Sequence, residues 1–324
     1  KVVVLPECWN GPYDTASFPV YAEPVPDPQG DETAAEMPSA EQSPSAAMLC
    51  RAAAENKVWL VGGSVPEAGK DGGVYNTCIV VGPSGRIAAK HRKVHLFDID
   101  VPGGITFKES DTLSPGDSIT TVETPFGTIG VGICYDMRFP ELSMAMRAAG
   151  SVLLCFPGAF NMTTGPAHWE LLQRARALDN QVGKRHADEG TRHPTHISFS
   201  FSHVLRSHRK VHRSCWTLLM DALSAGRLTS WFWLGFLPHV PHALSYPRFF
   251  CYVVTASPAR NPDSKYQAWG HSSIVDPWGN VVATTEHEEA MVVAEVDVGR
   301  VAEVRTSIPV SLQKRPDLYR LELP

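Results

Sequence analysis

The sequence of 324 residues lacks the cysteine spacings of a disulfide framework or a zinc finger. Its seven cysteines are odd in number, unevenly spaced and form no CxxC pair. We interpret them as reduced thiols and expect a cytoplasmic location, with a mitochondrial one as the alternative. Outside residues 183–251 no apolar run approaches the length of a membrane span, and the net charge of −5 gives no basic excess. We therefore expect neither a membrane nor a nucleic acid as a partner.

The sequence also lacks any segment before its first strand. Residues 1–5 (KVVVL) predict a buried β-strand, and no initiator methionine, signal peptide or capping segment precedes them. A chain that begins inside a core strand leads us to expect an N-terminal truncation. With 43% hydrophobic residues, the chain can still bury a large core in one or two domains.

Cys134 lies where an apolar run is expected to turn into a helix. Residues 128–133 (TIGVGI) predict a buried strand, and Pro140 suits the first turn of a following helix. Such a turn presents a side chain at the end of the strand, beside the N–H groups of the helix. We expect a thiol in that positive field to be held as a thiolate. A buried structural cysteine has the same local pattern.

Two charged residues also follow strands. Glu7 comes directly after the first strand, at the end of an α/β sheet where ligands commonly bind. Lys93 lies between His91 and His95 and is followed by apolar residues, which is unusual for a plain surface. Each residue is compatible with a solvated surface charge as well as with a functional site.

Strands and helices alternate along most of the chain. Besides residues 1–5 and 128–133, we expect strands at residues 58–64, 75–81, 86–91, 119–123, 151–157, 252–256, 271–276, 281–284 and 291–296. We expect helices at residues 46–56, 142–149, 167–180 and 301–306, with Trp169, Leu172, Ala175 and Leu178 on the apolar side of the third. Tight turns at residues 82–85 and 276–280 predict hairpins, and residues 107–110 and 113–117 are expected to be loops. This order predicts an α/β sandwich.

Residues 183–251 differ in composition from the rest of the chain. This stretch of 69 residues contains eight of the thirteen histidines, and nine Lys and Arg against three Asp and Glu. Its aromatic-rich part shows neither the strand nor the helix period. A zinc site, a basic nucleic-acid-binding arm and a membrane-surface patch are alternatives, but the spacing of its histidines and Cys215 fits no zinc finger. We interpret the stretch as an irregular insert.

Several segments together resemble the nitrilase superfamily of carbon–nitrogen hydrolases, most closely its omega-amidase branch. They are residues 5–7 (LPE), 92–98 (RKVHLFD), 132–139 (GICYDMRF), 156–161 (FPGAFN), 165–170 (GPAHWE), 269–272 (WGHS) and 275–279 (VDPWG). The resemblance covers residues 1–182 and 252–324, which we take as a single carbon–nitrogen hydrolase domain. It implies an αββα four-layer sandwich, N-terminally truncated and interrupted by the insert, and assembled as a homodimer. Because the family runs directly from helix into core strand here, and residues 183–184 fit a splice donor, we expect the insert to be a retained intron or a gene-model error.

The resemblance implies a catalytic set of Glu7, Lys93 and Cys134, supported by Glu109. Glu7 is the general base, and Lys93 stabilises an oxyanion together with the backbone N–H of Tyr135. The charge of Lys93 is also expected to hold the thiol as a thiolate. Glu109 matches a second glutamate that orients the substrate or Lys93. No metal or organic cofactor is implied.

The implied substrates are small-molecule amides, namely 2-oxo acid monoamides such as 2-oxoglutaramate and 2-oxosuccinamate, hydrolysed through a thioester. The candidate substrate-binding residues are Tyr135, Arg138, Asn161 and Thr164. Gly158, Asn161 and Trp269 favour the omega-amidase branch over the neighbouring branch, which hydrolyses deaminated glutathione. That activity, or another amidase activity of the superfamily, is the alternative. A non-catalytic binding protein is the alternative of another class, because truncation and insert would leave the sandwich incomplete.

Overall fold

A computed structural model describes residues 1–28, 37–180, 251–310, 313–315 and 317–319. The elements of the first part are β1 (Val2–Val4), α1 (Phe18–Tyr21), α2 (Pro44–Asn56), β2 (Trp59–Val61), β3 (Val65–Ala68), β4 (Val74–Val81), β5 (Ile87–Arg92), β6 (Asp98–Asp100) and β7 (Thr106–Lys108). The elements of the second part are η1 (Glu109–Asp111), β8 (Thr120–Val122), β9 (Thr128–Val131), η2 (Cys134–Arg138), α3 (Pro140–Ala148), β10 (Ser151–Pro157), α4 (Gly165–Asp179), β11 (Tyr252–Ala256), β12 (Ser273–Val275), β13 (Val281–Thr284) and α6 (Val298–Ser307). The expected insert, except Cys251, lies outside the described residues.

The first sheet contains five strands in the order β1-β2-β4-β3, with β5 paired to β4. β1 and β2 are parallel, and the other neighbours are antiparallel. The predicted hairpin across residues 82–85 is confirmed as β4–β5, in which Thr77 pairs with Arg92 and Cys78 with His91. The sequence does not predict β3, because Pro66 and Glu67 interrupt its apolar pattern; antiparallel pairing with β4 defines it instead.

The second sheet contains six strands in the order β13-β12-β11-β10-β9-β8. Its central strands β9, β10 and β11 are parallel to one another. All seven residues of β10 are buried, as expected for a parallel strand covered on both faces. The strand predicted at residues 291–296 is wrong, because this segment pairs with no strand in the described part of the chain, although Val292, Ala294 and Val296 alternate into the core.

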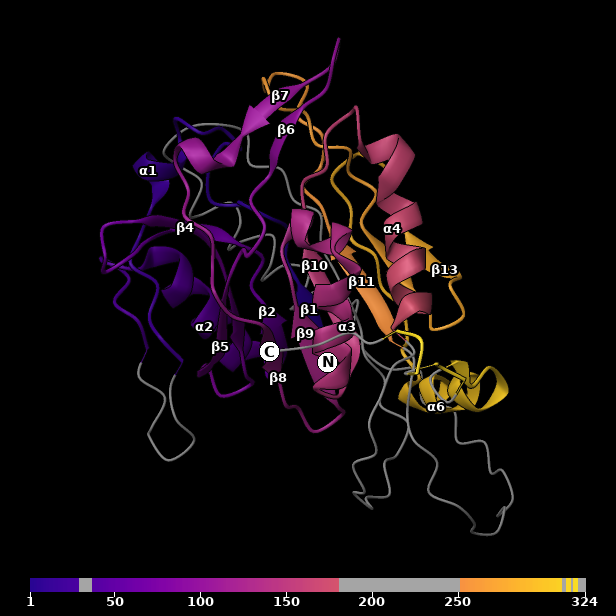
Figure 1. Cartoon of the computed structure of the whole chain (residues 1–324). Helices are drawn as coiled ribbons and strands as arrows, with labels where there is room; N and C mark the ends of the chain where they lie inside the picture. Colours follow the sequence, from indigo (N-terminus) through magenta and orange to yellow (C-terminus); the bar gives the residue numbers. More distant parts are fainter. Residues whose placement is uncertain (29–36, 181–250, 311–312, 316, 320–324) are drawn as a thin grey trace.

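The two sheets pack face to face, and helices cover their outer faces (Figure 1). Alternation along β4 points Val80 inward, into one core with Ile129 of the second sheet, and Ile79 outward, against Leu49 of α2. α3 packs on β9 and β10, and α4 packs on β11 and β12. This order of layers confirms the predicted αββα sandwich.

The helix α4 confirms the predicted apolar side at Trp169 and Leu172 but not at its C-terminal end. Trp169 is buried as expected, but Leu178 is 42% exposed. Arg176 turns inward instead, because its guanidinium donates to the carbonyl oxygens of Met137 (2.8 Å) and Arg138 (3.2 Å). A buried cation that satisfies chain carbonyls thus overrides the apolar periodicity of the helix.

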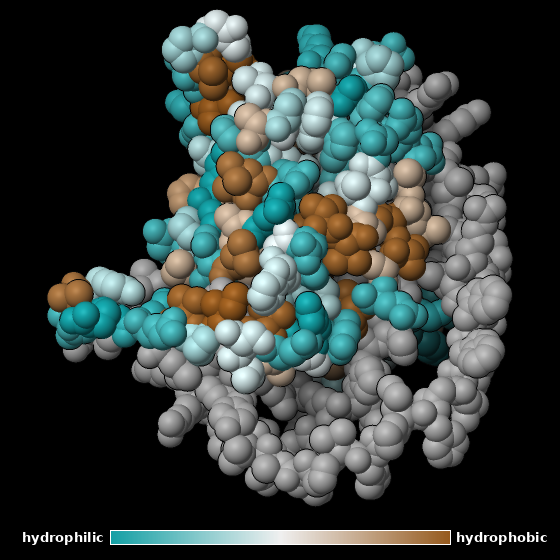
Figure 2. All heavy atoms as spheres, turned by 90° about the vertical axis from the view of Figure 1, so that its right-hand side faces the viewer, coloured by the Kyte–Doolittle hydropathy of each residue, from teal (hydrophilic) through white to brown (hydrophobic). Residues whose placement is uncertain are grey.

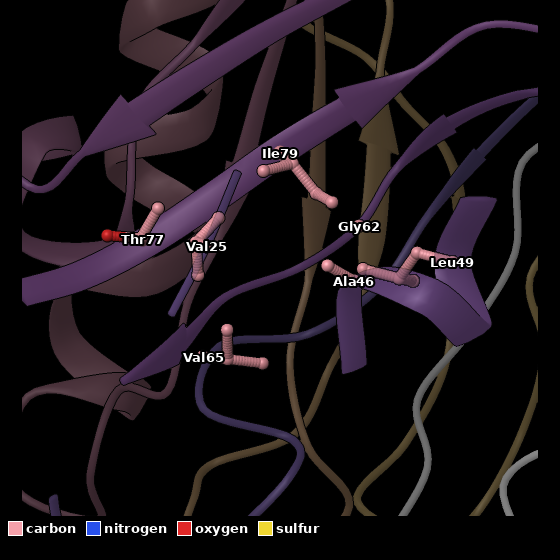
Figure 3. Close-up of a pocket in the computed structure, with 7 residues that line it drawn as sticks. All are labelled: Val25, Ala46, Leu49, Gly62, Val65, Thr77 and Ile79. Carbon is pink, nitrogen blue, oxygen red and sulfur yellow. The ribbon is translucent and has the colours of Figure 1, made fainter. Parts of the chain in front are cut away.

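A small cavity of about 10 Å³ lies between α2 and the first sheet (Figure 3). Its lining is Val25, Ala46, Leu49, Gly62, Val65, Thr77 and Ile79. Thr77 supplies the polar hydroxyl of this lining, and that hydroxyl already donates to Glu67 at 2.6 Å. The cavity offers room for about one water molecule and contains none of the predicted site residues, so it is a gap in packing.

Two expectations from composition concern thiols and membranes. The six cysteines of the described residues are free thiols and buried, as predicted; Cys215 lies outside these residues. Among the helices of the described segments, none is both long and apolar enough to cross a membrane.

Candidate active site

Cys134 lies at the turn between β9 and α3, as predicted. β9 ends at Val131, η2 begins at Cys134, and Pro140 occupies the first turn of α3. The φ angle of Cys134 is 48°, in the left-handed region that side chains rarely adopt. A Cβ at Gly158 would lie 3.3 Å from the Cα of Cys134, so glycine permits this close approach. Strained backbone at a buried thiol is typical of a functional turn.

Glu7, Lys93 and Glu109 form one buried cluster, each side chain being fully inaccessible. The Nζ of Lys93 donates to Oε1 of Glu7 at 3.0 Å and to Oε1 of Glu109 at 2.9 Å. The Oε2 of Glu109 accepts from the backbone N–H of Phe97 at 2.7 Å. One ammonium therefore lies between two carboxylates, which leaves the cluster with an excess of acidic groups.

Different strand ends bring these three residues together. Glu7 follows β1, and Lys93 follows β5, where its backbone N–H donates to the carbonyl of Asn76 at 2.8 Å. The expected loop at residues 107–110 is wrong: β6 and β7 form a hairpin at the top of Figure 1, and η1 follows directly. This hairpin ends at Lys108 and so delivers Glu109 to the cluster.

Groups that the sequence does not single out complete the hydrogen bonding. The Nδ2 of Asn76 donates to Oε1 of Glu7 at 2.9 Å, and the backbone N–H of Ala159 donates to Oε2 at 2.8 Å. The hydroxyl of Tyr13 donates to Oε1 of Glu109 at 2.7 Å. Asn76 carries a signal that could have been used, since a polar side chain inside a buried strand needs a partner. Tyr13 has no local signal, and Ala159 contributes only backbone.

Aromatic rings enclose this cluster. Tyr13 stacks in a tilted geometry on Tyr266, with ring centroids 4.5 Å apart, and Phe107 contacts both rings. The hydroxyl of Tyr266 donates to the carbonyl of Ala159 at 2.5 Å. Low-dielectric walls of this kind strengthen the electrostatic interactions inside them.

Burial and neighbouring charges together shift the pKa values of the groups in the site. It raises the pKa of the Glu7 carboxyl, although Lys93 opposes this shift. Burial alone would lower the pKa of Lys93, but Glu109 and Glu7 raise it well above its usual range, so the ammonium is retained. Burial also raises the pKa of the Cys134 thiol well above its usual range, and Glu7 adds to this. This direction opposes the predicted thiolate and favours a thiol whose proton a neighbouring base removes.

Arg138 and Tyr135, two of the candidate substrate-binding residues, lie next to each other beyond Cys134. The guanidinium of Arg138 lies 5.4 Å from the ring centroid of Tyr135 and 4.8 Å from that of Phe160. One of its nitrogens contacts Nδ1 of His168 at 3.3 Å. Its Nε is buried and has no hydrogen-bond partner among the described residues. Arg138 therefore retains donor capacity for an anion.

Asn161 and Thr164, the other two candidates, bind each other. The Oδ1 of Asn161 accepts from the backbone N–H groups of Thr163 and Thr164, both at 2.9 Å, and from the Thr164 hydroxyl at 3.2 Å. These bonds organise the turn that precedes α4. The Nδ2 of Asn161 is buried with no partner in the described part of the chain, so it is this amide group that remains available.

The fold is that of a carbon–nitrogen hydrolase. The family model described as carbon-nitrogen hydrolase matches residues 1–182 and 248–306. The chain belongs to this family, which is part of the nitrilase superfamily.

Two relatives with known names are similar to nearly the whole length of this chain. The chain is 44% identical over 321 residues to the chloroplastic omega-amidase of Arabidopsis thaliana, and it spans 65% of the length of that relative. It is 43% identical over 325 residues to omega-amidase NIT2 of Homo sapiens, of which it covers 86%. Both alignments cover at least 99% of this chain.

Solved structures agree with this placement. The structure of Saccharomyces cerevisiae Nit3, a member of branch 10 of the nitrilase superfamily, matches 96% of this chain and 82% of its own, with a TM-score of 0.65 and 35% identity. The C. elegans NitFhit protein matches 98% of this chain and 58% of its own, with a TM-score of 0.63 and 28% identity.

Proposed function

We propose that the chain is an omega-amidase. It hydrolyses the terminal amide of 2-oxo acid monoamides, such as 2-oxoglutaramate and 2-oxosuccinamate, to the 2-oxo acid and ammonia. The observation that carries the proposal is the buried cluster of Glu7, Lys93 and Glu109 beside a buried Cys134 with a strained backbone. The relatives named omega-amidases, at 43–44% identity, support the choice of substrate.

Acylation begins when Glu7 accepts the proton of the Cys134 thiol, a role for which its raised pKa is suited. The sulfur attacks the amide carbon, and the carbonyl oxygen becomes an oxyanion that faces the Lys93 ammonium and the backbone N–H of Tyr135. Glu7 then passes its proton to the amide nitrogen as the C–N bond breaks. Ammonia leaves, and a thioester remains on Cys134.

Deacylation uses the same groups in a second cycle. Glu7 accepts a proton from water, whose oxygen attacks the thioester carbon. The C–S bond breaks, the proton returns to sulfur, and the 2-oxo acid leaves. Glu109 holds Lys93 as an ammonium through both half-reactions. The scheme requires neither a metal ion nor an organic cofactor.

The far carboxylate of the substrate requires a cationic or amide partner. We assign this role to Arg138, whose Nε is unpartnered among the described residues, and to the free Nδ2 of Asn161. Thr164 orients Asn161 through their mutual hydrogen bond. Tyr135 contributes its backbone N–H, while its ring contacts Arg138.

The test is release of ammonia from purified protein supplied with 2-oxoglutaramate, 2-oxosuccinamate or deaminated glutathione. Cys134→Ala is the control; we expect it to abolish turnover and leave substrate binding largely intact, because only the nucleophile is lost. Turnover confined to deaminated glutathione would assign the chain to the neighbouring branch. A folded protein that hydrolyses no amide would be a binding protein.

We further propose that residues 1–182 and 252–324 form one hydrolase domain and that residues 183–251 are an insert without a role in it. The family model supports an insert at residues 183–247, which it omits, whereas it includes residues 248–251. Joining Val182 to Tyr252 should raise the melting temperature and the specific activity together, because the apolar residues of the insert follow no strand or helix period. A lower melting temperature after the deletion would contradict the proposal. Sequencing the mature transcript across residue 183 tests the retained-intron interpretation separately.

A homodimer is also proposed. Hydrophobic residues gather on the face that carries α4 and β13 (Figure 2), where Leu171, Leu178 and Val282 are 64%, 42% and 46% exposed. Pairing of two such faces would remove apolar surface from water. Light scattering should give twice the mass of one chain, and Leu171→Glu should reduce it to that of the monomer. A cytoplasmic location remains a prediction from the reduced thiols.

A further inference from the structure

Asp136 is a fully buried acid two residues after the nucleophile, and the scheme above does not use it. Its Oδ1 accepts from the backbone N–H of His95 at 2.9 Å and contacts Nδ1 of the same residue at 2.8 Å. Its Oδ2 accepts from the backbone N–H of Ile133 at 2.9 Å and contacts Nε2 of His91 at 3.1 Å. Both oxygens therefore have two partners each.

These four contacts join the two segments that supply the chemistry. Ile133 is the residue before Cys134, and Asp136 lies in η2, which Cys134 begins. His91 and His95 flank Lys93, two residues before it and two after it. One carboxylate thus connects the turn that carries the thiol to the segment that carries the ammonium.

Both histidine rings also have a second contact, in addition to the one with Asp136. The Nδ1 of His91 contacts the Thr120 hydroxyl of β8 at 2.9 Å. The ring of His95 stacks on Phe139, with ring centroids 3.6 Å apart and an angle of 9° between the planes. Phe139 directly precedes α3, so the contacts extend from β8 to the helix that follows the nucleophile.

We propose that Asp136, together with His91 and His95, is a positioning unit that fixes the Cys134 thiol relative to Glu7 and Lys93. The inference rests on the proposed hydrolysis for its activity readout, but not for its chemical-modification readout. The left-handed backbone conformation of Cys134 is unfavourable by itself. Asp136 accepts a hydrogen bond from the backbone N–H of Ile133, the preceding residue. A thiol displaced by about 1 Å would lose on the order of 100-fold in rate.

Asp136→Asn is the first test. Asparagine keeps the shape, but it has one acceptor oxygen and directs an NH₂ group at existing donors. We expect kcat per titratable Cys134 to fall by about 10- to 100-fold with KM changed by less than about 3-fold. We expect alkylation of Cys134 by iodoacetamide at neutral pH to slow by a similar factor, because the thiol leaves its base. Cys134→Ala gives the background labelling of the other thiols.

Matched histidine variants separate hydrogen bonding from charge and packing. Asparagine at 95 places an N–H near the position of Nδ1, and glutamine at 91 places one near Nε2, whereas leucine supplies none. We expect His95→Asn and His91→Gln to keep kcat and alkylation rate within about 3-fold, and both leucine variants to lose about 10-fold. The side chain of His95 is 29% exposed, so its pair of variants is the safer one for folding.

Two results would overturn the inference. One is an Asp136→Asn enzyme whose kcat and alkylation rate per titrated thiol stay within about two-fold of the parent. The other is equal loss in the asparagine and leucine variants of His95, which would assign the effect to the ring itself. If the parent hydrolyses no amide, the alkylation rates still decide the positioning role, and the proposed function alone fails.

Discussion

Two clusters of acidic and basic side chains lie on opposite faces of β4 and β5, and only the inner one lies beside the nucleophile Cys134. The inner cluster is Glu7, Lys93 and Glu109. The outer cluster is Glu67, Lys90 and Arg92, in which Glu67 Oε1 accepts from Lys90 at 3.2 Å and from Arg92 at 2.8 Å. Both clusters pair glutamate with basic side chains, and Arg92 and Lys93 are adjacent in the sequence, so the difference lies in the ratio of acids to bases, in partners and in burial.

Strand alternation separates the two clusters. Asn76 donates to Glu7 on the inner side, whereas its neighbour Thr77 donates to Glu67 on the outer side. Lys93 is fully buried, whereas the side chain of Arg92 is 28% exposed and stacks over a tyrosine ring. A shift of one residue in register would exchange the two sets.

The balance of charge then gives the two acids opposite properties. Burial alone would raise the pKa of Glu67, but Arg92, Thr77 and Lys90 lower it. Burial raises the pKa of Glu7, and Lys93, which it shares with the second carboxylate of Glu109, does not reverse this shift. An acid with surplus cations is a stable anion, whereas an acid that lacks them can accept a proton from a thiol.

Replacing the lysine of each cluster should give the largest difference in kcat between the two clusters. Lys93→Met should lower kcat by at least about 100-fold, because it removes the oxyanion partner and leaves two buried carboxylates unpaired. Lys90→Met, three residues earlier, should leave kcat within about two-fold, since the contacts of Lys90 within the described residues are with Glu67, Asp27 and a carbonyl of Val25. Steady-state ammonia release measures both. Equal losses would show that the outer cluster also belongs to the site.

The two acids provide the second comparison. Glu7→Gln removes the base and should lower kcat by at least about 100-fold. Glu67→Gln should leave kcat nearly unchanged but cost about 1–3 kcal/mol of unfolding free energy, because Arg92 loses its carboxylate partner and Lys90 keeps Asp27 but loses Glu67. Chemical denaturation and ammonia release distinguish these outcomes. The double variant Glu7→Gln with Lys93→Met should lose less than the product of both single losses, since the groups act as a unit.

The sequence predicts which residues form the inner cluster, but not the burial and the hydrogen bonds that shift their pKa values. Glu7, Lys93 and Cys134 stand at strand ends within recognisable motifs, and the structure places Glu7, Lys93 and Glu109 in direct contact. The state of Cys134 could not be predicted, because local sequence shows a helix terminus but not the burial that raises its pKa. The Asn76 contact, in turn, depends on the register of a hairpin.

The fold shows the same limit. β10 and the β4–β5 hairpin follow from continuous apolar runs and a tight turn. β3 and the inward Arg176 depend on partners far along the chain, namely strand β4 and the carbonyls of η2. Tertiary contacts of this kind leave no periodic signal in the local sequence.

The contributions of Glu67 and Glu7 to the stability of the protein should change with pH in opposite directions. Glu67 has a folded-state pKa below its ordinary value of 4.5, so its contribution is present above that pH and disappears as the pH falls through the lowered value. Glu7 has a raised folded-state pKa, so the folded protein loses stability as the pH rises above 4.5. The melting-temperature advantage of the parent over Glu67→Gln should shrink on acidification. Its advantage over Glu7→Gln should shrink as the pH rises. Slopes of the same sign would contradict the charge-balance argument.

The smallest expected effect on activity comes from removing one tyrosine hydroxyl beside each cluster. Tyr13→Phe removes the donor to Oε1 of Glu109 and leaves the ring packing against Tyr266 intact. We expect kcat/KM to fall by about 10-fold, the lower end of the worth of one hydrogen bond to a charged group. The same hydroxyl lies 3.4 Å from Oε1 of Glu7. Loss of this donor should raise the pKa of Glu7 further, so the acid limb of the pH profile should move to higher pH.

Tyr75→Phe is the matched control on the outer side. It removes the hydroxyl that donates to Asp71 and keeps the ring under the Arg92 guanidinium. Because neither group touches the inner cluster, kcat/KM and the acid limb should remain those of the parent. A shifted acid limb in Tyr75→Phe, or an unshifted one in Tyr13→Phe, would mean that the hydroxyl of Tyr13 does not act on the charge of the inner acids. Its contact with Glu109 would then serve packing, and the inner cluster would depend on Lys93 alone for its balance of charge.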